Sequence, residues 1–201
     1  MQLVNRMLRG IIKVISYIRY KPFFVEYHFS DSIKKPICVT PQFIKLGKHV
    51  VIYYHARING IASYNGIDFH PLIIIKDGVR IQQNLHLTCA KSVVIGPNTA
   101  IAANVTITDI NHPYTDITLP IEQQDLEVTP VKIGKDCKIY NNAVILPGTI
   151  IGNHVTIGAN AVVNGIIPDF SVAVGAPAYI IKRYDFSIGQ WRKTDKEGNF
   201  I

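Results

Sequence analysis

Apolar positions along this chain recur at every sixth residue, and between residues 131 and 163 the period is unbroken. The aliphatic members of this run are Ile133, Ile139, Ile145, Ile151, Ile157 and Val163. A small or compact residue stands two positions before each of them, from Val131 to Ala161. Half-buried strands would alternate with period two and a helix with a period of about 3.6, whereas a period of six is typical of a parallel β-helix. Three such units form one coil of a triangular prism, with the aliphatic and compact residues pointing inward.

The same spacing groups the inward positions into triples, and every interruption falls between two triples. The triples are Leu46, Ile52 and Ile58; Ile75, Ile81 and Leu87; Ile95, Ile101 and Ile107; Ile133, Ile139 and Ile145; and Ile151, Ile157 and Val163. If each triple is one coil, every irregular connection follows a third strand, so all insertions leave one corner of the prism. We therefore predict an all-β fold with a repeat domain over residues 44–185, whose longest insertion is the loop at 108–130.

Residues 1–21 have a different pattern, which predicts a short basic amphipathic helix before the repeat. One helical stripe is apolar (Val4, Met7, Leu8, Ile11, Ile15, Ile18) and another is basic (Arg6, Arg9, Lys13). The apolar run is too short and too interrupted by charge to span a bilayer. Such a helix can lie on an anionic membrane surface, or it can cap the open end of the prism with its apolar stripe, and both interpretations stay open. A polar C-terminal tail follows the repeat at residues 186–201.

Composition narrows the class of protein and of partner. The chain has 201 residues, 48% of them hydrophobic, which fits one globular domain, and its formal net charge of +7 favours anionic partners. No nucleic-acid-binding module is recognisable, so a nucleic acid is not expected as a partner. Three scattered cysteines are too few for a disulfide framework, which indicates a cytoplasmic protein, peripheral on the inner face of the membrane if residues 1–21 bind there.

The long insertion holds the first candidate for chemistry, the sequence Asp109-Ile110-Asn111-His112-Pro113. One coil earlier, Asn84 and His86 stand just before a third-strand position, so stacking of neighbouring coils can bring the three polar side chains together at one edge. A neutral imidazole can accept a proton from an attacking hydroxyl or amine, and an asparagine can donate to a developing oxyanion. On spacing alone, however, a single histidine in a loop is more often solvated than catalytic.

Several segments together resemble the hexapeptide-repeat acyltransferases. They are the repeat itself, the loop D-x-N-H-P-Y, the segment I-L-P-G-T-I-I-G and the tail V-G-A-P-A-Y-I-I-K-R-Y. Within that family the chain is most similar to O-acetyltransferases of sugar and surface-polysaccharide biosynthesis, over roughly residues 44–185. The resemblance implies a left-handed β-helix, a homotrimer, acetyl-CoA bound in grooves between neighbouring prisms, and direct transfer to a sugar hydroxyl without a metal.

The resemblance also implies roles for individual residues. His112 matches the family's general base, Asn84 a residue of the acceptor pocket, and His86 a histidine common in the polysaccharide branch. Asn111 and Tyr114, which flank His112 in the same motif, are expected to bind the acceptor. Three further positions match residues that bind the acyl donor, with Asn141 and Ala159 on the pantetheine groove and Lys182 near the phosphates.

The expected function is therefore O-acetylation of a sugar in lipopolysaccharide, capsule or exopolysaccharide biosynthesis, with acetyl-CoA as the donor. N-acetylation of a nucleotide-linked amino sugar is one alternative. A γ-carbonic-anhydrase-like metalloenzyme is another, although the His-x4-His spacing of that family is absent after His112. A non-catalytic β-helix scaffold is the third, and the intact N-H-P loop argues against it.

Overall fold

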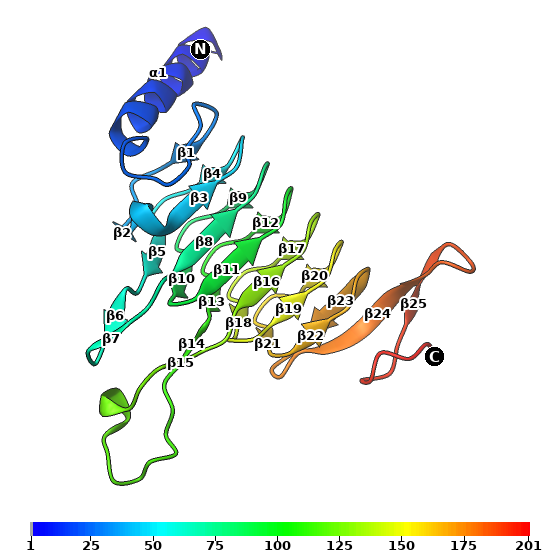
Figure 1. Ribbon diagram of the computed structural model, residues 1–201. Coiled ribbons are helices and arrows are strands. Elements are labelled where there is room, and N and C mark those ends of the chain that lie inside the picture. Colours follow the sequence, from blue (N-terminus) through cyan, green and yellow to red (C-terminus); the bar gives the residue numbers. More distant parts are fainter. Residues whose placement is uncertain (1) are drawn as a thin grey trace.

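The computed structural model describes residues 2–201, with side chains described from residue 10 onward except at residue 12. Three sheets form the faces of a triangular prism (Figure 1). Sheet I contains β3 (Ile44–Leu46), β8 (Leu72–Ile75), β11 (Ser92–Ile95), β16 (Val131–Ile133), β19 (Ile150–Ile151) and β22 (Ile166–Ile167). Sheet II contains β1 (Ser32–Ile33), β4 (Val51–Ile52), β9 (Arg80–Ile81), β12 (Ala100–Ile101), β17 (Lys138–Ile139), β20 (Thr156–Ile157) and β23 (Ser171–Val174). Sheet III contains β2 (Cys38–Val39), β5 (Arg57–Gly60), β10 (His86–Cys89), β13 (Thr106–Thr108), β18 (Val144–Ile145) and β21 (Val162–Val163).

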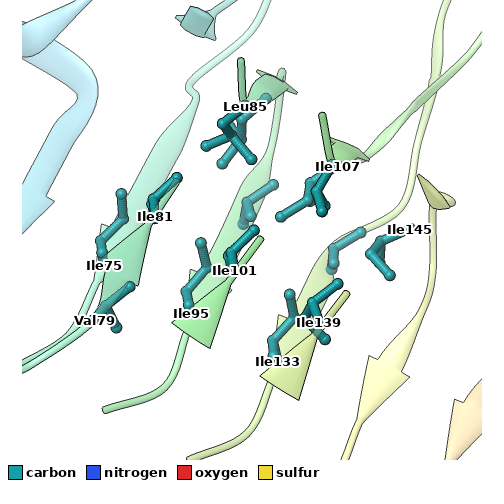
Figure 2. Close-up of a cluster of buried hydrophobic side chains, with 14 of the residues drawn as sticks. Ile75, Val79, Ile81, Leu85, Ile95, Ile101, Ile107, Ile133, Ile139 and Ile145 are labelled. Atoms are coloured by element: carbon teal, nitrogen blue, oxygen red, sulfur yellow. The ribbon is translucent and has the colours of Figure 1, made fainter. Parts of the chain in front are cut away.

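Each coil contributes one parallel strand to each of these sheets, so the fold is the predicted left-handed parallel β-helix. The register confirms the predicted triples, because Ile95 pairs with Ile75 and Ile133 in sheet I, and Ile107 pairs with Leu87 and Ile145 in sheet III. The inward aliphatic side chains therefore stack in columns along the prism axis (Figure 2). Their burial is nearly complete, and it supplies the main driving force for this fold.

All insertions leave one corner, between sheets III and I, as the spacing predicts. A hairpin of β6 (Ser63–Tyr64) and β7 (Ile67–Asp68) follows β5, and the long loop follows β13. Within that loop β14 (Ile110–Asn111) pairs with β15 (Glu127–Val128), and η2 (Ile121–Gln123) is a short 3-10 turn. Figure 1 shows the hairpin and the loop projecting from the same side of the prism.

The two regular corners are built from residues that tolerate a tight turn. Between sheets I and II, a Cβ on Gly134 would lie 2.3 Å from the carbonyl oxygen of Gly152 in the next coil, so only glycine fits. Between sheets II and III, four asparagines have φ near +60°, a left-handed conformation that asparagine tolerates better than most residues. Each donates its side-chain amide to the next, in the order Asn84, Asn104, Asn142 and Asn160.

The β-helix begins earlier than residue 44, where the repeat was predicted to start. Glu26 forms a parallel bridge with Lys45, and β1 and β2 continue this first coil before η1 (Pro41–Phe43). Tyr27, Ile33 and Val39 are spaced by six, as in the other coils. Because the first of these positions is aromatic, this coil lacks the aliphatic triple that marks the other coils.

Helix α1 (Gln2–Tyr20) precedes this first coil and closes one end of the prism (Figure 1). Tyr17 and Tyr20 pack against Tyr27, with ring centroids 6.3 and 6.1 Å away, so the aromatic C-terminal turns form the cap. The apolar stripe, by contrast, is exposed at Ile11, Ile15 and Ile18, so the capping interpretation, one of the two left open above, does not hold at these positions. The stripe and basic residues predicted before residue 10, Val4, Arg6, Met7, Leu8 and Arg9, lie outside the described side chains. No helix in the described residues 2–201 is long and apolar enough to cross a bilayer.

At the other end of the prism, sheet II is continued by strands of reversed direction. Strand β24 (Tyr179–Asp185) pairs antiparallel with β23, and β25 (Gln190–Lys193) pairs antiparallel with β24. The predicted C-terminal tail therefore contains a strand rather than only irregular chain. An ion pair of 3.0 Å between Arg192 and Asp185 holds the hairpin together.

Candidate active site

A small pocket lies on the outer face of sheet III, where the two insertions leave the prism. Its volume is about 330 Å³, and it is lined by Ile61, Tyr64, His86, Thr88, Thr106, Thr108, Ile110, His112 and Leu126. The predicted convergence therefore holds for His86 and His112, which line the same pocket. Partial burial, and then the nearby Arg57, lower the pKa of His86, so its ring is neutral at neutral pH. Threonine hydroxyls form the pocket floor, and Thr88 donates to Thr108 over 2.9 Å.

The loop that bears His112 is anchored by the fully buried Asp109. One carboxylate oxygen accepts the amide of Ala90 at 2.8 Å, and the other accepts the amides of Lys91 and Ser92 at 2.8 and 2.7 Å. The thiol of Cys89 donates to the second oxygen over 3.3 Å, and burial together with the charge of Asp109 raises the pKa of that thiol. Asp109 is thus saturated by donors and is placed to position the loop rather than to accept a proton.

Tyr64, which is not among the predicted site residues, holds the two insertions together. Its ring packs edge-on against that of His112, with centroids 5.5 Å apart. Its hydroxyl donates to the backbone and side-chain oxygens of Glu122, each at 2.8 Å, and this bond to the carboxylate raises the pKa of the phenol. Asn65 adds a donor to the backbone oxygen of Glu122 at 3.0 Å. We call these contacts the Tyr64–Glu122 clasp.

Two other predicted acceptor residues lie in the loop but do not line the pocket. Asn111 donates from its side chain to Glu127 over 3.2 Å, across the β14–β15 pair. The Tyr114 side chain is largely exposed. Asn111 is therefore engaged within the loop, and Tyr114 faces solvent in this protomer.

Asn84 lies at the opposite end of β10 from the insertions, at the corner between sheets II and III. Its φ is +61°, and its side-chain amide donates to Asn104 over 2.9 Å. The structure therefore does not bring Asn84 to the His112 pocket of the same chain. Its observed contacts belong to the asparagine ladder of that corner.

Comparison with known proteins identifies the family. Residues 130–165 match the bacterial transferase hexapeptide family (six repeats). Over 129 residues the chain is 40% identical to the putative lipopolysaccharide biosynthesis O-acetyl transferase WbbJ of Escherichia coli K12, covering 61% of this chain and 66% of the relative. Over 186 residues it is 43% identical to the probable acetyltransferase Rv3034c of Mycobacterium tuberculosis, covering 87% of this chain and 62% of the relative. This chain belongs to the hexapeptide-repeat acetyltransferase family.

The chain spans slightly less than two thirds of the length of each of these two relatives. Among solved structures, it is similar to the hexapeptide-repeat acetyltransferase VCA0836 of Vibrio cholerae, complexed with acetyl coenzyme A. That match has a TM-score of 0.52 and 23% identity, and it covers 84% of this chain and 76% of the Vibrio chain. At this identity the likeness concerns the fold.

In this member of the hexapeptide-repeat acetyltransferase family, the predicted donor-binding residues lie toward the C-terminal coils. Asn141 and Ala159 are exposed and adjacent at the sheet II–III corner, where the amide of Asn160 donates to the carbonyl of Asn141 over 3.0 Å. Lys182 is exposed on β24, opposite Val172 of β23. Within the described part of the chain, no three His, Cys, Asp or Glu side chains are grouped as a metal ion would require.

Proposed function

We propose that this protein is an acetyl-CoA-dependent O-acetyltransferase that modifies a sugar hydroxyl of a lipopolysaccharide, capsule or exopolysaccharide precursor. The observation that carries the proposal is His112, held by an anchored loop over a pocket lined by threonine hydroxyls. Among the relatives, the Escherichia coli protein, a putative lipopolysaccharide biosynthesis O-acetyl transferase, supports the proposal. The acetyl coenzyme A complex of the Vibrio protein supports the choice of donor.

The chemistry assigned to His112 is general base catalysis. A sugar hydroxyl is a weak nucleophile at neutral pH, so a base must take its proton as the oxygen attacks the thioester carbonyl. His112 accepts that proton and returns it to the departing coenzyme A sulfur, which leaves the acetyl group on the sugar oxygen. The hydroxyls of Thr88, Thr106 and Thr108 supply donors and acceptors for the other hydroxyls of the sugar.

The exposed surface around Asn141, Ala159 and Lys182 suits an extended donor in its composition. An amide, a small residue that leaves its backbone open, and a cation are the groups that a pantetheine arm and its phosphates would use. In the proposed homotrimer, this surface of one protomer faces the neighbouring prism, and the donor binds in the groove between them. Sedimentation of a stable monomer at micromolar concentration would refute the shared groove.

The decisive experiment replaces His112. His112→Ala and His112→Asn should lower kcat about 10²- to 10⁴-fold while acetyl-CoA still binds, because only the proton transfer is lost. Turnover is measured as coenzyme A release with a panel of sugars, amino sugars, lipid-linked oligosaccharides and host polymers. Activity above about a tenth of the original in His112→Ala would place the base elsewhere.

The pH profile adds an independent readout. The unaltered enzyme should gain activity as the pH rises, because only an unprotonated imidazole can accept the proton of the sugar hydroxyl. Because the pKa of His86 is lowered, its own titration falls at more acidic pH, and His86→Gln should keep the main rise. If His86→Gln loses this rise, His86 rather than His112 is the general base.

A further inference from the structure

The N-terminal end of the molecule carries an apolar stripe that the fold leaves uncovered. Ile11, Ile15 and Ile18 of α1 are 54%, 58% and 70% exposed, although each lies on a well-formed helix. Val14 is also exposed, at 42%. Isolated exposed aliphatic residues need no explanation, but four along eight residues of one helix form a patch of the kind that contacts a partner.

The direction of this stripe is set by the packing of α1 on the first coil. Ser16 is buried and shares a 2.6 Å hydrogen bond with the Tyr27 hydroxyl, while Tyr17 packs edge-on against Phe29. Because these contacts use one side of the helix, Ile11 and Ile18 are held on the side that faces away from the prism, and Ile15 lies at the edge of the groove beside the helix. The packing of α1 on the first coil therefore fixes the orientation of the stripe.

Beside the stripe lies a groove of about 800 Å³ between α1 and the first coils. Four cations from both walls line it, Lys13 and Arg19 from α1 and Lys34 and Lys35 from the turn after β1. The remaining lining is aliphatic, aromatic, hydroxyl or proline, and no acidic side chain of the described residues contributes to it.

Nearby carboxylates do not neutralise these cations. The first acidic residue of the chain is Glu26, which pairs with His28 at 3.0 Å. The next, Asp31, is fully buried and accepts the backbone amides of His28 and Val50. The Lys34 ammonium lies 4.0 Å from the centre of the Tyr53 ring, an arrangement that leaves its positive charge uncompensated by an anion.

We propose that this N-terminal surface, the isoleucine stripe together with the basic groove, docks the protein on an anionic phospholipid bilayer. The stripe enters the boundary between headgroups and acyl chains, and the groove takes lipid phosphates. A bilayer satisfies the aliphatic and the cationic parts at once. A second copy of the same surface would bring a second set of uncompensated positive charges against the first, and a free anion would leave the stripe in water. This docking is a binding property separate from the proposed acetyl transfer.

The test uses point variants, because deletion of residues 1–21 would uncover the aromatic contacts of Tyr27. Full-length protein is sedimented with vesicles of phosphatidylcholine alone, or of phosphatidylcholine mixed with phosphatidylglycerol. The unaltered protein should bind the mixed vesicles, lose this binding at high salt, and bind phosphatidylcholine weakly. Equal binding to both vesicle types, or to neither, would overturn the proposal whatever the variants do.

Two pairs of substitutions separate the stripe from the groove. Ile15→Ser/Ile18→Ser should lower binding to the mixed vesicles about tenfold or more, through lost apolar burial. Lys13→Gln/Lys34→Gln should lower it about tenfold and flatten its salt dependence.

Matched controls lie at the far end of the prism. Ile188→Ser, in the exposed turn between β24 and β25, and Lys193→Gln/Lys196→Gln should leave binding within about twofold of the original. A loss in the controls equal to that in the N-terminal variants would refute docking through this surface. If Ile15→Ser/Ile18→Ser instead changes the oligomeric state and spares vesicle binding, a second copy covers the stripe and the proposal is wrong.

Discussion

Replacement of Asp109 by asparagine should destabilise the fold even though the two side chains have the same shape. The carboxylate gives one oxygen to the amide of Ala90 and the other to the amides of Lys91 and Ser92. Asparagine has a single oxygen, so its NH2 group must face at least one of these N–H donors. In the better orientation the amide of Ala90 is left unpaired, at a cost of about 1–3 kcal/mol, and the two remaining bonds lose their charge. The expected loss in the free energy of unfolding is therefore about 2–4 kcal/mol.

Urea unfolding at neutral pH measures this loss, and coenzyme A release under the same conditions measures its effect on the site. Asp109→Asn should also lower kcat, because Asp109 anchors the start of the loop that carries His112. Asp125→Asn removes an exposed carboxylate from the same loop and should change neither quantity. A loss in the free energy of unfolding below about 1 kcal/mol for Asp109→Asn would show that the backbone finds other acceptors, and would refute the anchoring role.

Three other substitutions test the remaining contacts. Tyr64→Phe keeps the edge-on contact with His112 but removes both bonds to Glu122, so kcat/KM should fall about two- to tenfold, and an unchanged value would deny the clasp any part in catalysis. Lys182→Ala should raise the KM for acetyl-CoA in a salt-dependent manner with kcat nearly kept, whereas an unchanged KM at low salt would remove this residue from the site. Asn84→Ala should cost about 1–2 kcal/mol in thermal unfolding, since alanine tolerates the positive φ poorly, while a raised acceptor KM without a stability loss would place Asn84 at an acceptor site instead.

The coils could be predicted from sequence because their periodicity is a direct result of stacking. The inward position is aliphatic in most coils, so the spacing between Leu87 and Ile107 indicates that these residues lie side by side. The meeting of His86 and His112 follows from the same stacking, since His86 pairs in register with Thr106, shortly before the long loop. The first coil was not predicted, because Tyr27 replaces an aliphatic residue there.

The contacts made by the insertions could not be predicted in the same way. The Tyr64–Glu122 clasp depends on how two irregular segments fold on each other, and no period relates residues 63–68 to residues 121–123. The sequence indicated only that both insertions leave the same corner of the prism. Asn84 was grouped with His86 because it is close in sequence, but the left-handed turn at this corner separates it from the pocket.

The two unlike ends of the prism have a consequence for how the protein behaves in concentrated solution. A stack of parallel coils has no intrinsic length, and an open terminal coil would offer three rows of unpaired backbone groups as a template for further copies. At one end α1 and its tyrosines cover the first coil, and at the other β24 runs against the direction of the stack and ends in a hairpin rich in arginine and lysine. The molecule is in this sense a short segment of a potential filament whose extension is blocked at both ends. Removal of either block should allow a discrete protein to polymerise.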